Sequence, residues 1–486
     1  MQCPHRIWRD IYGPQEEKIE EINPFVQMLW DRGSQYEKKV ISDIGIFVDI
    51  STGSFEERFK RTKRAMDDGE SLIYQGVLIV DEIMGIPDLL KKVSDRKYLP
   101  IDIKSGMGVE GVDEDAGDEG LLKKHYAVQI ALYADALKRL GYGDDTGGVI
   151  LDIKGNEVVY DLNQQIGPRT PMSYWGLYEQ VKNDVAILMR NENPNKPALA
   201  GTCKLCPWYS SCKKWVKEQD DPTGLFYVGR GKRDVLSEDI SVNTIDNILK
   251  IDVDEVLARK KNDKTLLKGV GDSTLQKMVN RARIMKITKE PVVYSEVNFP
   301  EARYELFFDI EDDPTQEFVY LHGVYERSPD GERYLDFTAK SINAESEKKA
   351  WADFWAYIRS LPKDDFSVYY YSAHEKTTYK RMQKMYFDVV SAEEVEGFFN
   401  RPKTIDLYSV VLKNTDWPVD SYSIKELATY CGFSWRDKTP SGALSIQWFN
   451  EYIKTGDEKI LKRILEYNED DCKATMIVMD KIKSIQ

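Results

Sequence analysis

Two apolar segments of the chain carry charged residues two positions apart, and this feature most narrows the folds that the chain can adopt. Leu-Pro-Ile-Asp102-Ile-Lys104 places an acid and a lysine around one isoleucine, and Leu-Phe-Phe-Asp309-Ile-Glu311 places two acids in the same way. Side chains at positions i and i+2 of a β-strand point to the same face of the sheet. Each segment is therefore predicted to be a strand that brings two charged groups into one site.

The composition is that of an ordinary folded protein. Of the 486 residues, 42% are hydrophobic and 31% are charged, which disfavours a disordered chain. At roughly 100 to 200 residues per domain, a chain of this length suggests two to four domains. No apolar run reaches the ~20 residues of a membrane-spanning helix, and the first residues lack the apolar core of a signal peptide. We therefore expect a cytoplasmic protein with no membrane partner.

The net charge of −14 at first argues against a nucleic-acid partner. A metal-dependent nuclease needs clustered carboxylates, however, and contacts to phosphate need only a local basic groove. The acidic stretch at residues 110–119 contributes to the imbalance and is expected to be a solvated loop. Net charge alone therefore does not decide the partner.

An acid in a preceding apolar segment is expected to complete the first charged group. Gly-Val-Leu-Ile-Val-Asp-Glu-Ile-Met-Gly-Ile-Pro has the character of a strand and leads to Asp88. Asp88 and Asp102 could hold Mg²⁺ or Mn²⁺, which lowers the pKa of a bound water and offsets charge on a phosphate. Lys104 could orient that water and stabilise the developing negative charge. The spacing alone is weak support, because charged residues two positions apart occur on many exposed strands.

A predicted amphipathic helix follows these strands. Gln129 and Tyr133 lie four positions apart in it and share one face, where they could hydrogen-bond the substrate backbone or the metal-bound groups. In order and spacing, Gly-Ile-Pro-Asp88, Ile-Asp102-Ile-Lys104 and Gln129-x3-Tyr133 resemble the motifs of the PD-(D/E)XK nucleases, specifically the RecB family. The resemblance implies a restriction-endonuclease-like fold that hydrolyses phosphodiester bonds of DNA.

Many members of that family carry a metal-binding histidine on an early helix, and this chain departs from them. The matching stretch is Arg-Gly-Ser-Gln-Tyr36-Glu37, with Tyr36 where the histidine is expected. Glu37 could compensate for the missing ligand. The departure bears on the strength of metal binding more than on the family.

Four of the six cysteines form a pattern: Cys3, Cys203, Cys206 and Cys212. In a reducing cytoplasm, Cys-x2-Cys indicates a metal clamp or a redox pair rather than a structural disulfide. One cysteine before the nuclease core and three after it resemble the iron–sulfur staple of helicase-linked and CRISPR-associated RecB nucleases. The resemblance implies a structural 4Fe–4S cluster that ties the ends of the domain together. Four thiolates could equally hold Zn²⁺ in a tetrahedral site.

The middle of the chain is predicted to be mainly helical and carries a short glycine motif. Leu-Leu-Lys268-Gly269-Val-Gly271 resembles the turn of a helix-hairpin-helix DNA-binding motif. Such a turn exposes backbone N–H groups at a helix N-terminus, where they can bind phosphate without reading sequence. Counter-charge would come from Lys264, Lys268, Lys277, Arg281 and Arg283. An ordinary linker between two helices is the alternative.

The second constellation joins the pair Asp309 and Glu311 to a distant helix. Tyr467-Asn-Glu-Asp-Asp471 places Tyr467 and Asp471 four positions apart on one helical face. This pattern resembles the DEDD exonucleases of the RNase H-like fold, in the variant that ends with Tyr-x3-Asp. The resemblance implies a 3′–5′ exonuclease domain, whose three acids would hold two metal ions about 4 Å apart while Tyr467 orients the attacking water.

The third acid of that family is where this chain departs from the pattern. The family usually has aspartate there, and this chain has Glu375, in a polar turn expected after another strand. Glutamate is one methylene longer, which could shift the metal spacing or lower the activity. Asp406, at the end of a further predicted strand, is another acid that could contribute. A degenerate binding domain stays open as the alternative to an active exonuclease.

Together the patterns predict an α/β multidomain protein of three parts. They are a RecB-like PD-(D/E)XK nuclease domain at residues 1–222, a small helical linker domain at 223–297, and an RNase H-like DEDD domain at 298–486. Polar residues, proline and glycine crowd together near the first boundary. The chain as a whole resembles a bacterial and archaeal family that joins these parts.

We expect a nuclease with two sites that uses Mg²⁺ or Mn²⁺ to hydrolyse DNA at ends or in single strands. The chain lacks the Gly-x4-Gly-Lys-Ser/Thr motif of an ATPase, so a separate helicase is expected if duplex DNA is processed. Two alternatives remain open. One is a nucleic-acid-binding scaffold with one or both sites degenerate, and the other is an RNA-processing exonuclease.

Overall fold

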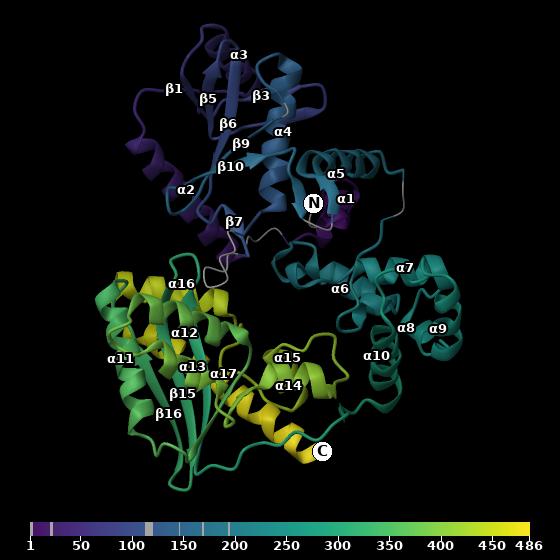
Figure 1. Ribbon diagram of the computed structural model, residues 1–486, viewed down its shortest axis with the longest axis vertical. Helices are drawn as coiled ribbons and strands as arrows, with labels where there is room; N and C mark the ends of the chain where they lie inside the picture. The colour runs from purple at the N-terminus through teal and green to yellow at the C-terminus, as the bar shows by residue number, and fades with distance from the viewer. Residues whose placement is uncertain (1–2, 20–22, 112–119, 145, 168–169, 193–194) are drawn as a thin grey trace. The chain divides into compact units, whose positions relative to one another are not determined.

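The computed structural model describes the chain except residues 1–2, 20–22, 112–119, 145, 168–169 and 193–194 (Figure 1). Most of the acidic stretch expected to be a solvated loop therefore lies outside the described residues. The chain divides into two compact units, the first comprising residues 1–22 and 26–196 and the second comprising 23–25 and 197–486. None of the described helices is long and apolar enough to cross a membrane.

The first unit is built on a six-stranded mixed sheet, in the order β1-β2-β5-β6-β9-β10. The strands β1 and β2 pair in parallel, as do β6 and β9, and the other neighbours pair antiparallel. The strands of this sheet are β1 (Val48–Asp49), β2 (Leu72–Tyr74), β5 (Leu89–Ser94), β6 (Lys97–Ile103), β9 (Gly147–Leu151) and β10 (Glu157–Asp161). The helices are α1 (Pro4–Tyr12), η1 (Gln15–Glu17), α2 (Pro24–Asp43), α3 (Phe55–Asp67), α4 (Lys124–Leu140) and α5 (Tyr174–Met189).

Three two-stranded hairpins complete this unit: β3 (Leu78–Val80) with β4 (Ile83–Gly85), β7 (Val109–Glu110) with β8 (Leu121–Leu122), and β11 (Gln165–Gly167) with β12 (Thr170–Ser173). The first hairpin corrects the prediction of a single strand leading to Asp88. The chain reverses at Asp81, whose φ is 49°, in the left-handed region that suits a tight turn. Asp88 still directly precedes a strand, because β5 begins at the next residue.

The alternation of side chains along β6 decides which face of the sheet carries the charged group. Ile101 and Ile103 belong to a buried cluster that includes Tyr36 and Val40 of α2. Asp102 lies between them and points to the opposite face. That face is covered by α4, whose buried positions recur at helical spacing: Ala127, Ile130, Ala131, Ala134 and Leu137. Figure 1 shows α2 and α4 on opposite sides of the sheet.

The second unit begins with short helices, which continue through residues 223–288 of the region predicted to be mainly helical. They are η2 (Gly201–Leu205), α6 (Tyr209–Glu218), η3 (Pro222–Gly224), α7 (Arg230–Ile240), α8 (Ile245–Ile248), α9 (Val253–Asn262), α10 (Asp272–Arg283) and the π-helical turn η4 (Ile284–Thr288). A small core of their own holds α7 to α10 together, with Leu236, Ile248, Val256, Leu275 and Met278 among its members.

The remainder of this unit is an α/β fold around a five-stranded sheet, in the order β16-β15-β14-β17-β18. The strands β14, β15 and β16 are antiparallel, and β17 and β18 run parallel to β14. The strands are β14 (Tyr304–Asp313), β15 (Phe318–Ser328), β16 (Gly331–Thr338), β17 (Phe366–Tyr370) and β18 (Thr404–Asp406), with a separate pair of β13 (Val292–Val293) and β19 (Thr415–Asp416). The helices are α11 (Ala344–Ser360), α12 (Ala373–Met385), α13 (Ala392–Asn400), α14 (Leu407–Asn414), α15 (Ile424–Tyr430), α16 (Gly442–Thr455) and α17 (Glu458–Ile485).

The two faces of β14 belong to different cores. Leu306, Phe308 and Ile310 pack against aromatic residues of α11, α12 and α13. Phe307 faces the other way, into the core that contains the C-terminal half of α17. The odd-numbered positions Asp309 and Glu311 therefore face α17.

Candidate active sites

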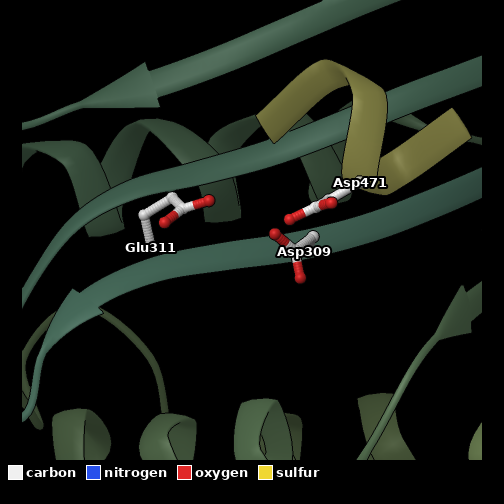
Figure 2. A group of neighbouring side chains, drawn as sticks. All are labelled: Asp309, Glu311 and Asp471. Carbon is white, nitrogen blue, oxygen red and sulfur yellow. The ribbon is translucent and has the colours of Figure 1, made fainter. Parts of the chain in front are cut away.

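Three carboxylates that are far apart in the sequence meet in the second unit. Ligand oxygens of Asp309, Glu311 and Asp471 all lie within 4.8 Å of one another. Figure 2 shows the carboxylates of the two β14 residues and of the α17 residue turned toward a common space. Within the part of the chain that the structure describes, no other three histidine, cysteine or acidic residues meet this closely. Hard oxygen ligands in such a group suit Mg²⁺ or Mn²⁺.

The electrostatics of this group favour a bound cation. Burial, reinforced by the neighbouring acids, raises the pKa of Asp309 well above its ordinary value and the pKa of Glu311 to about 8. Burial also raises the pKa of Asp471. Like charges held together out of water cannot all ionise without compensation, and a bound cation supplies that compensation. The donor set therefore fits a divalent metal.

A buried asparagine holds two of the acids, and the sequence analysis missed it. Asn468 is fully buried on α17, and its Nδ2 donates to Asp309 Oδ2 over 2.8 Å and to Glu311 Oε1 over 3.5 Å. Its Oδ1 accepts from the hydroxyl of Tyr334 over 2.8 Å. Its position next to Tyr467, on the buried side of a predicted helix, was the available signal.

A glycine opposite Asp309 leaves space for the side chain of Asn468. Gly323 on β15 pairs with Asp309 across the antiparallel ladder. A Cβ at this position would overlap the side-chain oxygen of Asn468. Close approach of α17 to the sheet thus requires glycine here, for steric reasons rather than for an unusual backbone conformation.

Side chains from α15, from the segment between α15 and α16, and from β15 supply further contacts to the site. Trp435 Nε1 donates to Asp471 Oδ1 over 2.7 Å, and Lys425 Nζ donates to the hydroxyl oxygen of Tyr467 over 2.8 Å. Tyr320 donates to Ser445 over 2.9 Å and lies 3.4 Å from Glu311 Oε2. Lys425 and Trp435 precede their partners on α17 by tens of residues, so the spacing in the sequence gave no signal for these contacts.

Glu375 lies in the first turn of α12, not in the polar turn that was expected. Its Oε2 accepts from Ser372 Oγ over 3.1 Å, and burial raises its pKa to about 7. Its charge contributes to the raised pKa of Asp309, behind burial and the two closer acids, although Glu375 is outside the three-carboxylate group. Asp406 is the N-cap of α14 and accepts from Ser409 N over 3.1 Å, so its carboxylate caps the start of that helix.

The first unit brings Asp88, Asp102 and Lys104 together as the strand pattern predicts. Lys104 Nζ forms an ion pair with Asp102 Oδ2, and Asp88 Oδ2 accepts from the backbone N–H of Ile103 over 2.7 Å. Burial, followed by the charge of Asp102, raises the pKa of Asp88 to about 8. Two acids and a lysine thus lie together on the face of the sheet that α4 covers.

The helix α4 contributes the predicted glutamine and tyrosine. Lys104 Nζ donates to Gln129 Oε1 over 3.0 Å, and Gln129 Nε2 donates to the hydroxyl of Tyr133 over 2.8 Å. The ring of Tyr133 packs where a Cβ at Gly85 would clash with it, so this glycine makes room for the ring.

Of Tyr36 and Glu37, only Glu37 is connected to the group of Asp88, Asp102 and Lys104. The hydroxyl of Tyr36 donates to the carbonyl oxygen of Asp152 over 2.5 Å, and its ring belongs to the core beneath α2. Glu37 Oε1 accepts from Gln75 Nε2 over 2.7 Å, and the same nitrogen donates to Asp88 Oδ1 over 3.0 Å. The side-chain amide of Gln75 therefore bridges the carboxylates of Glu37 and Asp88, whereas the hydroxyl of Tyr36 contacts Asp152 instead.

The cysteines of the second unit lie close along the chain. Cys203 lies in η2, Cys206 directly follows it, and Cys212 lies in α6; all three are partly buried. The backbone N–H of Cys206 donates to the carbonyl oxygen of Cys203 over 2.9 Å. Among the described residues, these sulfur atoms do not form a group within 4.8 Å of one another. Cys3 precedes α1 in the first unit.

The predicted helix-hairpin-helix segment forms a turn between α9 and α10. Gly269 has a φ of 82°, in the left-handed region that favours glycine, and Gly271 is the N-cap of α10. Lys268 and Lys277 are exposed. Arg281 corrects a prediction, because it is buried and its Nε forms an ion pair with Asp416 Oδ1 at 2.6 Å, which removes it from the exposed basic set.

Comparison with protein families assigns both the N-terminal and the C-terminal part of the chain to known superfamilies. Residues 4–213 match the family model of the PD-(D/E)XK nuclease superfamily, and residues 306–483 match that of the RNase_H superfamily. No curated protein and no solved structure matches the chain. The chain therefore contains two domains of nuclease superfamilies, a PD-(D/E)XK domain followed by an RNase H-like domain.

Proposed function

We propose that this protein is a divalent-metal-dependent DNA nuclease with two active sites. The observation that carries the proposal is the buried group of Asp309, Glu311 and Asp471, whose raised pKa values mark a site short of positive charge. Mg²⁺ or Mn²⁺ bound there would acidify a coordinated water and offset the charge of a phosphodiester.

In the C-terminal site the protein's own groups hold the acids and orient the water. Asn468 fixes Asp309 and Glu311 relative to each other, and Trp435 fixes Asp471. Tyr467 lies one helical turn before Asp471 and supplies a hydroxyl for the attacking water, and Glu375 supplies the outlying acid. The order of these residues supports a 3′–5′ exonuclease of the DEDD type.

In the N-terminal site Asp88 and Asp102 would be the metal ligands, and Glu37, which Gln75 links to Asp88, is the candidate for a third carboxylate. Lys104 would stabilise negative charge on the phosphate, and its hydrogen bond to Gln129 fixes the ammonium. Tyr133 fixes Gln129 in turn.

The substrate we propose is DNA with an end or a single-stranded region. The turn at Gly269 and Gly271, with exposed Lys268 and Lys277, offers backbone N–H groups and positive charge to phosphates. Because such contacts do not read bases, they suit a nuclease without sequence preference. A separate helicase would supply single strands from duplex DNA.

We further propose that Cys3, Cys203, Cys206 and Cys212 bind a 4Fe–4S cluster. The same four thiolates could instead hold Zn²⁺ in a tetrahedral site with Zn–S bonds of about 2.3 Å. Iron, sulfide and zinc analysis of protein purified without oxygen distinguishes the two, since iron and sulfide in equal amounts support the cluster. Stoichiometric zinc with no iron overturns it.

Cleavage of labelled oligonucleotides tests the nuclease proposal. Wild-type protein is incubated with 5′-labelled and 3′-labelled single-stranded DNA, with and without Mn²⁺, beside Asp102→Asn and Asp309→Asn. The exposed Asp95→Ala and Asp330→Ala serve as controls, one in each unit. We expect each site variant to remove a different product ladder and both controls to match wild type.

The alternatives give other outcomes in the same assay. Binding of DNA with no metal-dependent cleavage by wild type would establish a scaffold in place of the nuclease. Faster cleavage of a matched RNA oligonucleotide than of DNA would establish the RNA-processing alternative.

A further inference from the structure

Lys425 lies beside the C-terminal acid group in a way that helix stability does not explain. It is in the first turn of α15, which Ser423 caps. The positive end of the helix dipole disfavours a cation at this position. Lys425 is only partly exposed, and both hydrogen bonds described for its ammonium go to uncharged oxygens, the carbonyl of Pro440 at 2.9 Å and the hydroxyl of Tyr467 at 2.8 Å.

The contact with Tyr467 constrains where the tyrosine hydroxyl can point. The hydroxyl oxygen accepts from Lys425. A lysine ammonium can only donate, so the phenolic proton must point away from Lys425. The remaining lone pair of the hydroxyl oxygen is then available to accept from a water molecule.

The charge of Lys425 acts on the same group. Burial raises the pKa of Asp309, Glu311 and Asp471, and Lys425 is the cation that opposes the rise at all three. Its ammonium also lies 4.8 Å from the centre of the Tyr467 ring, which keeps the lysine against the tyrosine as well as at its hydroxyl.

We propose that Lys425 is a positioning residue of the C-terminal site: its hydrogen bond to Tyr467 fixes the hydroxyl oxygen as the acceptor that orients the attacking water. This inference rests on the proposed nuclease function. Without Lys425 the phenolic hydroxyl can rotate about its C–O bond, and the water loses its fixed partner. Lys425 acts on the reaction through Tyr467 and need not touch the substrate.

A double-mutant cycle tests this role. All variants are made in full-length Asp102→Asn protein, so that only the C-terminal site contributes, and kcat and KM are measured on 5′-labelled single-stranded DNA with Mn²⁺. We expect Lys425→Met to lower kcat about a hundred-fold with little change in KM, as misplacement of a reacting group does. Tyr467→Phe should cost a similar factor, and the double variant no more than either single one.

Two further variants separate positioning from folding and from general charge. Lys425→Arg, which keeps a cationic donor, should recover part of the lost kcat. Lys462→Met removes a lysine whose side chain is 75% exposed on α17, and it should leave kcat unchanged. Thermal unfolding of each variant identifies any loss of kcat that comes from misfolding. If Lys425→Met is misfolded, the recovery of kcat in Lys425→Arg decides whether Lys425 positions Tyr467.

The possible failures are distinguishable. If the Asp102→Asn parent cleaves and Asp309→Asn abolishes that cleavage, but Lys425→Met is as active as the parent, only the role of Lys425 is overturned. Multiplying losses in the double variant would also overturn it, since they would show that Lys425 acts independently of Tyr467. If the parent shows no metal-dependent cleavage, the proposed function of this site falls and the inference falls with it.

Discussion

Asn468 donates a hydrogen bond to Asp309 over 2.8 Å, although 159 positions separate the two residues in the sequence. The same amide nitrogen lies 3.5 Å from Glu311, so one buried side chain spans both acids of β14. An amide is neutral, and it can hold two carboxylates in place without competing with a cation for their charge. Asn468 thus connects the helix that carries Asp471 to the strand that carries the other two acids.

Asn468→Ala should lower both stability and activity. The substitution leaves Asp309 and the hydroxyl of Tyr334 without a buried partner, which costs about 1 to 3 kcal/mol of unfolding free energy. We expect this loss in denaturant unfolding of the metal-free protein, together with a weaker apparent affinity for Mn²⁺ in the cleavage assay. Unchanged stability and unchanged metal dependence would show that Asn468 does not organise the acids.

Gly323→Ala should damage the same site from the opposite side. The added methyl group would overlap the side-chain oxygen of Asn468, so α17 must move away from β15 or Asn468 must change rotamer. We expect a stability loss of about 1 to 3 kcal/mol, as for overpacking of a core, and loss of the cleavage ladder that depends on Asp309. Gly331→Ala is not a suitable control, because Gly331 has a φ of 121°; Gly397→Ala is, since a Cβ there meets nothing within 4 Å.

The raised pKa of Glu311 predicts how pH and metal act on stability. Its ordinary pKa is 4.5 and burial raises it to about 8, so between these values the folded metal-free protein keeps a proton that the unfolded chain has lost. The free energy of unfolding therefore falls as pH rises through this window. A bound divalent cation replaces the proton, so stabilisation by Mn²⁺ should increase over the same range.

Thermal unfolding with and without Mn²⁺ at several pH values measures both effects. Glu311→Gln removes the titrating group, and it should raise the melting temperature of the metal-free protein at about pH 8, where repulsion among the acids is greatest. The same variant should lose most of the stabilisation by Mn²⁺. A Mn²⁺ effect that is equal in wild type and Glu311→Gln would contradict the assignment of this acid to the metal.

Spacing in the sequence predicted the parts of both sites that lie within one element or two adjacent ones. Asp102 and Lys104 alternate with buried isoleucines, Gln129 and Tyr133 lie one helical turn apart, and each pair shares a face in the structure. The β3–β4 hairpin was not predicted, because its turn residues Asp81 and Glu82 lack the Asn-Gly or Asp-Gly signal of a tight hairpin.

Contacts that depend on tertiary packing could not be read in this way. Lys425, Trp435 and Gly323 border the C-terminal site from three separate parts of the chain, and no local periodicity links them to Asp471. Arg281 shows the converse error. It was predicted to supply counter-charge to phosphates together with Lys277 and Arg283, but the packing of α10 buries it against Asp416.

Gln129→Leu should impair the N-terminal site without touching the C-terminal one. Lys104 loses the acceptor that fixes its ammonium at 3.0 Å and keeps the ion pair with Asp102 and the contact with the Tyr126 ring. In an Asp309→Asn background we expect kcat to fall roughly ten-fold to a hundred-fold, because a misplaced charge stabilises the developing anion less well. The exposed Gln165→Leu is the matched control. Equal kcat in both variants would show that Gln129 does not support Lys104 in the reaction.

Lys268→Ala and Lys277→Ala should weaken DNA binding in a way that reveals phosphate contacts. Each exposed lysine that neutralises one phosphate releases about one counterion, so each loss should reduce the slope of log affinity against log salt by ~0.7 on single strands. The weakening should be similar for oligonucleotides of different sequence, since phosphate contacts carry no base information. Binding is measured by fluorescence anisotropy without metal, so that cleavage does not interfere, with Lys462→Ala as the control. A slope that stays at the wild-type value in both variants would place the DNA on another surface and leave the turn at Gly269 as a linker between two helices.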